Sequence, residues 1–368
     1  MRVIIAGGGT GGHLFPGIAI AEEFLKRDDK ARVVFIGTKK GIESKLVSKL
    51  GYELKTVEVE GLKGRGMAAL VKGVYQVPKS LWQSRRIIKE FNPDIVIGVG
   101  GYASGPAVLA AHFMDKPTAI AEQNAVPGIT NKILGKCARK IFVTYEQTKK
   151  YFPEDKVVVS GNPVRAAFAA VKDAQKDNKK RNYLHLLVFG GSQGATAINK
   201  AMIDMLPKLV KTKRKIHVVH QTGARQVEKV KRAYQKYSIK AKVLPFIVDM
   251  VNAYSEADLI ICRAGATSLA EITAAGKPAI LIPYPWATND HQTKNAQAME
   301  DKGAAIMVRE SELAGGKLFE AVEGMFSDEK KLNNVAKKSA KLGNIKAAVE
   351  IVNECSKLIN ENMKEDNG

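Results

Sequence analysis

A glycine-rich turn that ends on a histidine, GGGTGGH at positions 7–13, follows the first apolar strand of the chain. Glycine permits positive φ and lets backbone N–H groups approach an anion, and the positive end of a following helix points at the same place. His13 titrates near neutral pH, which suits a general base. The pattern predicts a phosphate-type turn beside a catalytic histidine. The other interpretation is that His13 only caps the helix or lines the site.

The second half of the chain repeats this arrangement. The strand 186–189 runs into GGSQGA at 190–195, and the segments 94–101 and 258–265 form another matching pair of strand and turn. Near-continuous apolar strands that alternate with helices are typical of parallel sheets covered on both faces, and ligands bind at the carboxyl ends of such strands. We therefore expect two similar α/β domains that bind a phosphorylated ligand in the cleft between them.

A helix start in the second half offers a nucleotide site. The run from Gly265 to Glu271 opens a helix with small residues and places a carboxylate about one turn in. A pyrophosphate at the helix start and a ribose diol on Glu271 would form a suitable pair. The alternative is a capping box, in which Thr267 or Ser268 caps the helix and Glu271 bonds back to it.

The turn after the strand 241–244 offers a second nucleotide contact. Phe246 and Ile247 stand at this turn. An aromatic ring can stack on a base and backbone groups can bond to its edge, although buried aromatic residues more often belong to the core. Both interpretations stay open.

The first glycine turn also fits the dinucleotide fingerprint, because Gly7, Gly9 and Gly12 have its spacing. An NADP-dependent oxidoreductase is therefore one hypothesis for the function. The fingerprint expects an acidic residue roughly 20 positions on, at the end of the second strand, to hold the ribose. Lys39 and Lys40 stand there instead; they could accept a 2′-phosphate, but the second turn would then lack a ligand. No Walker lysine follows any glycine turn, which argues against an ATPase.

Composition narrows the class of protein. The chain of 368 residues has 58 Lys and Arg against 37 Asp and Glu, a net charge of +21, but no recognised nucleic-acid motif accompanies the charge, so we expect no nucleic acid. Three distant cysteines without metal-ligand spacing fit a reduced cytosolic compartment, and we expect no metal and no cofactor. The first strand begins near residue 2 and no apolar run approaches the ~18 residues of a membrane span, so we expect neither signal peptide nor transmembrane helix.

Strand patterns recur along both halves of the chain. We expect strands at 3–6, 33–36, 95–98, 118–121, 141–144, 184–189, 215–220, 241–244, 258–261 and 279–282. The GNPVR turn at 161–165 interrupts the alternation of strands and helices, because the residue before proline disfavours helix. We therefore expect one domain over 1–163, a second over 164–344 and a C-terminal helix within 345–368. The apolar stripe of that helix needs a domain to pack on, and either domain remains open.

Eight motifs carry a family resemblance over nearly the whole chain. In order they are GGGTGGH at 7–13, GGYASGPA at 100–107, AEQNAVPGITNK at 121–132, GNPVR at 161–165, GGSQGA at 190–195, HQTG at 220–223, CRAGATSLAE at 262–271 and DHQTKNA at 290–296. Their order and spacing resemble those of the bacterial lipid I N-acetylglucosaminyltransferases, the MurG type. The resemblance implies a GT-B fold, in which two Rossmann-like α/β domains with parallel sheets face each other across a cleft.

The resemblance also implies a reaction and its partners. An inverting transferase of this family moves GlcNAc from UDP-GlcNAc to the MurNAc 4-hydroxyl of lipid I, undecaprenyl-pyrophosphoryl-MurNAc-pentapeptide, and makes lipid II for peptidoglycan. The N-terminal domain would face the acceptor and the membrane, the C-terminal domain would bind the UDP-sugar, and the protein would be peripheral at the cytoplasmic face of the plasma membrane. A glycolipid synthase that uses UDP-galactose on diacylglycerol is the near alternative, and the oxidoreductase is the more remote one.

The motifs assign candidate residues to each role, since sugar donor and acceptor each contain a pyrophosphate and so give both glycine-rich regions a ligand. His13 is the first choice for the base, and Glu122 is the second. The resemblance implies that the sugar donor is bound by Thr10, Gly11, Gly12, Asn124, Arg165, Ser192, Ile247, Ala266, Thr267, Ser268, Leu269, Ala270, Glu271 and Gln292. For the acceptor we expect Gly9, Gly100, Gly101, Tyr102 and Ser104.

One segment combines positive charge with apolar side chains. Residues 63–89 contain seven Lys or Arg and no acid, with apolar residues at helical spacing interrupted by Pro78. A basic rim around apolar groups is how peripheral proteins hold an anionic leaflet. The predicted membrane face is Leu70, Lys72, Val74, Lys79, Leu81, Trp82, Arg85 and Arg86. The alternative is an ordinary amphipathic helix that buries its stripe and solvates its lysines.

Overall fold

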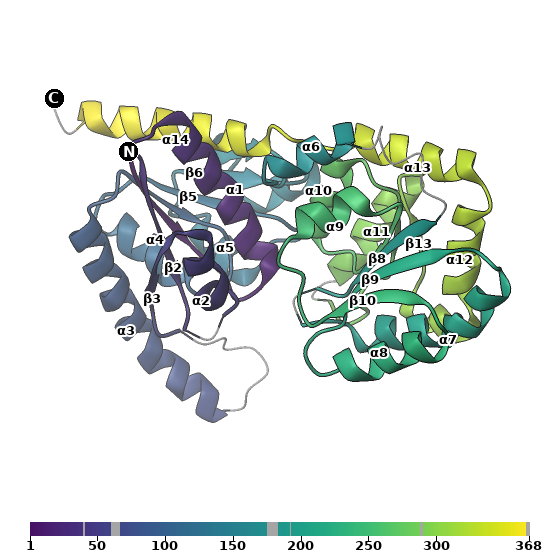
Figure 1. Cartoon of the computed structure of the whole chain (residues 1–368). Helices are drawn as coiled ribbons and strands as arrows, with labels where there is room; N and C mark the ends of the chain where they lie inside the picture. Colours follow the sequence, from purple (N-terminus) through teal and green to yellow (C-terminus); the bar gives the residue numbers. More distant parts are fainter. Residues whose placement is uncertain (40, 60–66, 175–182, 192, 288–289, 366–368) are drawn as a thin grey trace. The chain divides into compact units, whose positions relative to one another are not determined.

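The computed structural model describes residues 1–39, 41–59, 67–174, 183–191, 193–287 and 290–365, without the side chains of 45, 67–76, 172–174 and 365. The chain divides into two compact units, one formed by Met1–Arg165 with Lys346–Gly368 and the other by Ala166–Ile345. Figure 1 labels the helices and strands of both units.

The first unit is built on a seven-stranded parallel sheet with the order β3-β2-β1-β4-β5-β6-β7. Its strands are β1 (Arg2–Ala6), β2 (Arg32–Gly37), β3 (Glu53–Thr56), β4 (Ile95–Gly98), β5 (Thr118–Glu122), β6 (Lys140–Val143) and β7 (Val157–Val159). Its helices are α1 (Gly11–Arg27), α2 (Glu43–Leu46), α3 (Met67–Phe91), α4 (Ser104–His112), α5 (Ile129–Leu134) and α14 (Ala347–Glu365). Every residue of β4 and β5 is buried, as expected for central strands of a parallel sheet covered on both faces.

The second unit has a six-stranded parallel sheet with the order β10-β9-β8-β11-β12-β13. Its strands are β8 (Leu184–Phe189), β9 (Ile216–Gln221), β10 (Lys240–Leu244), β11 (Leu259–Cys262), β12 (Ala279–Leu281) and β13 (Ile306–Met307). Its helices are α6 (Ala167–Ala174), α7 (Thr196–Lys211), α8 (Val227–Lys236), α9 (Met250–Glu256), α10 (Ala266–Ala275), α11 (His291–Asp301), α12 (Lys317–Phe326) and α13 (Glu329–Lys341). The two sheets therefore share one topology.

This topology fixes where a ligand can bind in each unit. The strand order reverses between β1 and β4 in the first sheet and between β8 and β11 in the second. In open parallel sheets the helices on either side of such a switch point lie on opposite faces, which leaves a crevice at the carboxyl ends of the two strands. All four glycine turns predicted from the sequence follow these four strands.

The predicted strands agree with the observed ones to within one or two residues, and the prediction missed β3, β7 and β13. All three missed strands lie at sheet edges. β3 alternates exposed and half-buried residues, and β13 has two residues, so neither leaves a continuous apolar run in the sequence.

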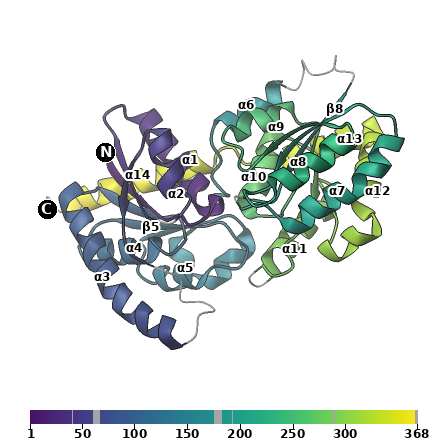
Figure 2. The same ribbon diagram turned by 60° about the horizontal axis from the view of Figure 1, so that its bottom comes forward.

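The C-terminal helix α14 packs on the first unit. Ile351, Cys355 and Leu358 are buried in one core cluster together with residues of β1 and α1. On α1, Arg27 donates through Nη1 to the Asn353 side chain at 2.7 Å and through Nη2 to a backbone carbonyl of α14. Figures 1 and 2 show the two helices side by side. The chain thus returns to its first unit after completing the second.

Candidate active site

The two glycine turns of the first unit pack directly against each other at the switch point. The Gly8 N–H donates to the Gly100 carbonyl at 3.2 Å, and a Cβ on Gly7 or Gly101 would overlap the backbone of the opposite turn. Gly7, Gly8, Gly100 and Gly101 all have φ between 82° and 154°, which L side chains rarely adopt. The sequence needs glycine here for close backbone approach as well as for turn geometry.

His13 lies in the first turn of α1 with its ring against the second glycine turn. Its Nδ1 is 3.2 Å from the Gly8 carbonyl and 3.4 Å from the Thr10 hydroxyl. A carbonyl oxygen only accepts, so Nδ1 carries the proton and Nε2 keeps its lone pair. Burial lowers the pKa of His13 below its usual value, while the Glu122 and Glu43 carboxylates act in the opposite direction. The imidazole is therefore neutral at neutral pH, as a general base must be.

A buried carboxylate that the sequence analysis overlooked supports the first glycine turn. Glu43 accepts hydrogen bonds from the Gly9 N–H at 2.7 Å, the Thr38 N–H at 2.8 Å and the Thr38 hydroxyl at 2.9 Å, and it is 1% exposed. A Cβ on Gly8 or Gly41 would overlap this carboxylate. The Gly9 N–H is therefore already bound, and the assignment of Gly9 to the acceptor stays a prediction.

The same observation weakens the dinucleotide interpretation. In that interpretation an acidic residue near the end of β2 would face a ribose. Glu43 is the acidic side chain that follows β2, and it is turned into the glycine turn, where it accepts from the Gly9 N–H and occupies the space that a Cβ on Gly8 would need. The signal that could have revealed Glu43 is an acid a few residues after the second strand of a glycine-turn unit.

Glu122, the predicted alternative base, is bound to the loop that follows β5. Its carboxylate, 3% exposed at the end of β5, accepts from Asn124 N at 2.9 Å, Asn124 Nδ2 at 3.1 Å, Gly128 N at 3.1 Å and Asn131 Nδ2 at 2.9 Å. Four N–H groups thus occupy its acceptor sites. In this structure the carboxylate organises the loop between β5 and α5, and Glu122 as an alternative base stays a prediction.

The remaining acceptor candidates fall into two groups. Tyr102 is 53% exposed beside Gly100 and Gly101 and stays a candidate. Ser104 is fully buried, and a Cβ on Gly98 would overlap its hydroxyl. Its hydroxyl is not exposed in this structure, and the assignment of Ser104 to the acceptor stays a prediction.

Several predicted sugar-donor residues of the first unit lie around His13. Thr10 and Gly12 are exposed, and Thr10 is the N-cap of α1, followed by Gly11 in the first helical turn. The Arg165 guanidinium lies 5.3 Å from the centre of the Phe15 ring on α1. Asn124 is half-buried beside Glu122. The structure thus brings Thr10, Gly11, Gly12 and Arg165 to the start of α1, while Asn124 belongs to the loop that Glu122 holds.

In the second unit the helix α10 begins as a phosphate site requires. Its N-cap is Gly265, which has no side chain, so no side-chain hydrogen bond caps the helix. The capping-box alternative for Glu271 is therefore wrong, because a capping box pairs an N-cap side chain with the residue three positions later. Glu271 lies further along the helix, 7% exposed, and accepts from the Tyr254 hydroxyl at 3.3 Å. The first turn is Ala266, Thr267, Ser268 and Leu269, followed by Ala270.

We expect Glu271→Ala to weaken UDP-GlcNAc binding by roughly 1.5–3 kcal/mol, because the resemblance implies a charge-assisted bond between this carboxylate and the ribose, which the variant would lose. Isothermal titration calorimetry with UDP-GlcNAc measures this change. Tyr254→Phe is the matched control, since it removes the internal hydrogen bond and leaves the carboxylate. If both variants bind the sugar donor as tightly as wild type and lose only thermal stability, Glu271 serves the fold and not the ligand.

Gln221 ties together two parts of the second unit that the sequence analysis assigned to the nucleotide. It is 1% exposed, donates to the Gly191 carbonyl at 2.7 Å and accepts from the Ile247 N–H at 2.7 Å. The glycine turn after β8 and the turn at Ile247 after β10 are therefore joined by one side chain. The HQTG motif contained this residue, but a buried amide has no periodic signal that separates it from ordinary core.

Two further residues of the second unit, Gln292 and Ser192, are candidate sugar-donor contacts. Gln292 accepts through Oε1 from the Tyr284 N–H at 3.0 Å and so holds the loop after β12. Ser192 lies outside the described residues. Within the described residues, no three or more His, Cys, Asp or Glu side chains are grouped as metal ligands.

The predicted membrane face lies on α3, and the structure shows which of its described side chains are exposed. Trp82 is 64% exposed and Arg85 is exposed. Leu81 packs against the apolar core of the first unit, so its assignment to the membrane face is corrected. The side chains of Leu70, Lys72 and Val74 lie outside the described part of α3.

Two of the basic residues on α3 are paired with acids just outside the predicted segment. Lys79 lies 2.8 Å from Glu58, and the Arg86 Nε lies 2.7 Å from Glu90 one helical turn away. The acid-free window therefore overstated the local positive charge. Among the described residues, no helix has the length and apolar character needed to cross a membrane.

Comparison with known proteins identifies the family. Two family models match, the glycosyltransferase family 28 N-terminal domain over residues 3–143 and the glycosyltransferase family 28 C-terminal domain over residues 185–353. The UDP-N-acetylglucosamine--N-acetylmuramyl-(pentapeptide) pyrophosphoryl-undecaprenol N-acetylglucosamine transferase of Syntrophus aciditrophicus is 54% identical, and the match covers 98% of this chain and 99% of the relative. The chain belongs to glycosyltransferase family 28.

Other relatives agree with this family 28 assignment. The transferase of the same name from Myxococcus xanthus is 49% identical over 98% of this chain and 93% of its own. The crystal structure of Acinetobacter baumannii MurG has 32% sequence identity and a TM-score of 0.73, and covers 97% of this chain and 99% of that one. A UDP-GlcNAc 2-epimerase from Neisseria meningitidis, at 14% identity and a TM-score of 0.67, shares the fold alone. The predicted resemblance, the GT-B fold class and the glycosyltransferase class are confirmed.

Proposed function

We propose that this family 28 chain transfers GlcNAc from UDP-GlcNAc to lipid I and forms lipid II, the precursor of peptidoglycan. The observation that carries the proposal is identity of 54% and 49%, over 98% of the chain, to relatives that bear the name of this transferase. The duplicated switch-point sites support it, because the reaction brings together two substrates that each contain a pyrophosphate.

The second unit is the proposed site for UDP-GlcNAc. The start of α10 presents backbone N–H groups and the positive end of the helix dipole to the diphosphate, with Gly265 leaving room for close approach. Glu271 would hold the ribose, and the turn at Ile247 would face the base. Charge that develops on the departing UDP is then stabilised by groups that are already oriented.

The first unit is the proposed site for the acceptor and for proton transfer. His13 Nε2 accepts the proton of the MurNAc 4-hydroxyl while that oxygen attacks the anomeric carbon of GlcNAc. The bond between this carbon and the β-phosphate oxygen breaks, and UDP leaves with the bonding electron pair. Attack from the face opposite the leaving group inverts the anomeric configuration.

A direct assay tests the proposed function. The protein is incubated with radiolabelled UDP-GlcNAc or UDP-galactose and a short-chain, water-soluble lipid I analogue, without added metal. We expect GlcNAc transfer and no galactose transfer. In a parallel incubation with diacylglycerol as the acceptor, galactose transfer would favour the glycolipid synthase. Failure to transfer either sugar, together with NADPH binding in a separate titration, would favour the oxidoreductase.

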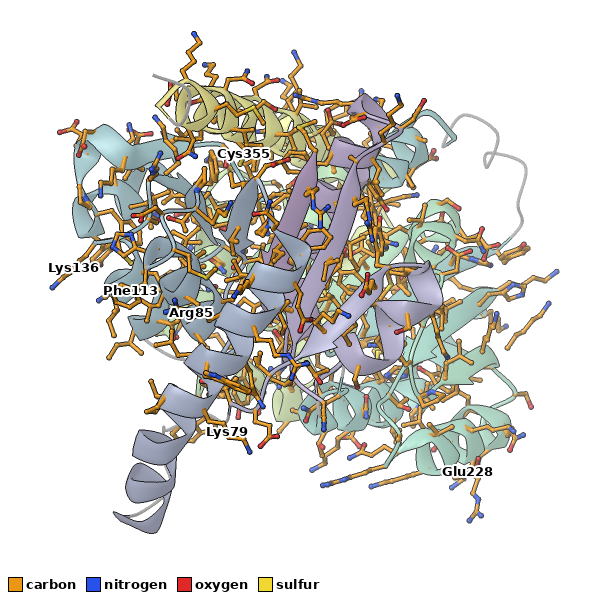
Figure 3. All side chains as sticks on the ribbon, turned by 90° about the vertical axis from the view of Figure 1, so that its left-hand side faces the viewer. Lys79, Arg85, Phe113, Lys136, Glu228 and Cys355 are labelled. Atoms are coloured by element: carbon orange, nitrogen blue, oxygen red, sulfur yellow. The ribbon has the colours of Figure 1, made fainter. Side chains whose placement is uncertain are left out.

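We also propose that the first unit binds the anionic surface of the membrane that holds the acceptor's prenyl tail, at the cytoplasmic face. Trp82 on α3 is 64% exposed and Phe113 after α4 is 67% exposed. α3 packs on α4 and α4 on α5, and Figure 3 shows Arg85, Phe113 and Lys136 on the same side of this unit. We call Trp82, Arg85, Phe113 and Lys136 the basic-apolar face. Such a mixture suits an interface with anionic lipid headgroups.

We expect the wild-type protein to sediment with vesicles that contain anionic lipid at low salt and to release at high salt, because salt screens the attraction. Replacing Arg85 and Lys136 with Gln should lower the fraction bound at low salt roughly 10-fold or more. Replacing Trp82 and Phe113 with Ala should weaken the binding that remains at high salt. Sedimentation at several salt concentrations measures both effects.

Lys229 and Lys231 on α8 provide the matched control, because they are exposed lysines of the second unit and their change to Gln removes the same charge. This control should sediment like wild type. Equal losses in both charge variants would mean that net charge, and not the basic-apolar face, determines binding. The test and control variants should all retain activity on the water-soluble analogue.

A further inference from the structure

We propose that Glu43 is a positioning residue for His13, holding the first glycine turn so that the His13 ring presents Nε2 to the acceptor hydroxyl. The inference rests on the proposed function, since it takes His13 as the base. Glu43 does not touch the reacting atoms. It acts through the turn that lies between its carboxylate and the imidazole.

The hydrogen bonds form a continuous chain from Glu43 to the ring. One carboxylate oxygen accepts from the Gly9 N–H at 2.7 Å, and the next carbonyl back along the turn, that of Gly8, lies 3.2 Å from His13 Nδ1. The other carboxylate oxygen accepts from the Thr38 N–H and hydroxyl, which ties the turn to the end of β2. The orientation of the Gly8 carbonyl therefore depends on where Glu43 holds Gly9.

The turn needs such a restraint because its backbone is intrinsically unconstrained. Gly7, Gly8 and Gly9 have φ of 154°, 135° and 82°, and glycine loses more conformational freedom on ordering than any other residue. Gly9 is exposed, so no packing holds it from the solvent side. Burying a carboxylate costs free energy unless it accepts hydrogen bonds. The Glu43 carboxylate accepts three, from two N–H groups and one hydroxyl, and these bonds also hold the turn.

Charge adds a second effect to the positional one. Two carboxylates face His13, Glu122 from the end of β5 and Glu43 from α2, and the Gly100 turn contributes only backbone. Both carboxylates raise the pKa of His13, but burial lowers it by more. Loss of the Glu43 charge with the ring still buried would lower this pKa further. Collapse of the turn, which exposes the ring to water, would raise it instead. The direction of the shift thus distinguishes a ring that is displaced but still buried from a ring that is exposed to water.

Glu43→Gln is the main variant, because glutamine keeps the shape but places an NH₂ group against either the Gly9 N–H or the two Thr38 donors. We expect kcat to fall roughly 10- to 100-fold from misplacement of the base, with the KM for UDP-GlcNAc unchanged within about 2-fold. The acid limb of the kcat/KM profile should move to lower pH. Glu43→Asp, which keeps both oxygens, should recover part of kcat.

Two further variants separate the claims. Thr38→Val removes the hydroxyl bond to Glu43 and leaves the Gly9 bond, so it should keep nearly all of kcat. Glu300→Gln in the second unit removes a helix carboxylate that also accepts a backbone N–H, from Met307 at 2.8 Å, and serves as the matched control. If Glu300→Gln and Glu43→Gln lower kcat and thermal stability equally, without a change in the pH profile, Glu43 only stabilises the fold and the proposal is overturned.

Measurements on the wild-type protein test the inference without turnover or mutation. Nitrogen-15 NMR of the histidine rings should show His13 with its proton on Nδ1, and hydrogen exchange should show a protected Gly9 amide despite its exposed position. An Nε2–H tautomer, or a Gly9 amide that exchanges as in an unstructured peptide, would overturn the proposal. These readouts are independent of the substrate, so failure of the transfer assay would reject the proposed function and leave the positioning inference to be judged alone.

Discussion

His13→Ala should lower kcat by about 10²- to 10⁴-fold while UDP-GlcNAc affinity stays nearly unchanged. The reason is geometric, because Nδ1 donates to the Gly8 carbonyl and Nε2 is the ring atom left to accept a proton. Steady-state kinetics with the soluble lipid I analogue and calorimetry with UDP-GlcNAc measure the two quantities. Survival of kcat with only a higher KM for the acceptor would show that His13 binds and does not catalyse.

The pH dependence of the wild-type enzyme checks the same assignment. Burial lowers the pKa of His13 from 6.5, and the base works in its neutral form. The acid limb of kcat/KM should therefore fall at a pH below 6.5, and this limb should be absent from the residual activity of His13→Ala. An acid limb that remains in the variant belongs to another group.

The glycine-rich part of the candidate site in the first unit was predictable, because glycine turns carry a strong local signal. The motifs at 7–13 and 100–107 each follow an apolar strand, contain glycines and lead into a helix. Each of these features constrains the backbone through sterics alone. The doubly wound order of the sheets follows from repeated strand and helix units. The structure adds that the two turns fit together through Gly8 and Gly100, which no single turn reveals.

The carboxylates were harder to assign because their roles depend on which way a side chain points. Glu122 and Glu43 both lie near the glycine turns, and each accepts hydrogen bonds from backbone N–H groups. A sequence shows that an acid follows a strand and cannot show whether its oxygens are already bound. For the same reason Ser104 looked like an acceptor contact and is buried.

The positive charge on α3 was overestimated for a third reason, the choice of the sequence window over which the charges were counted. Residues 63–89 contain no acid, yet Lys79 and Arg86 find Glu58 and Glu90 just beyond its limits. Residues four apart on a helix are neighbours, and β3 and its following chain can supply acids from further away. Charge patterning is therefore informative only with the neighbours that the fold supplies.

Glu122→Ala should destabilise the protein by about 3–5 kcal/mol, because it leaves four N–H groups without their acceptor in a site that is 3% exposed. Chemical denaturation, followed for the first unit by a local probe, measures this loss. Glu122→Gln keeps one acceptor oxygen and should lose less. In both variants the KM for UDP-GlcNAc should rise, since Asn124, a proposed sugar-donor contact, lies in the loop that Glu122 organises.

The kinetics separate this role from that of a base. For a base, Glu122→Gln would lower kcat by about 10²- to 10⁴-fold with thermal stability unchanged; for an organising carboxylate, stability falls and the folded enzyme keeps most of kcat. Thr148→Val is the matched control, because the buried Thr148 hydroxyl donates to the Ala125 carbonyl of the same loop at 3.2 Å. It should reproduce the rise in KM on a smaller scale. The acid limb of Glu122→Gln should also move to lower pH, since removal of this negative charge disfavours the protonated His13.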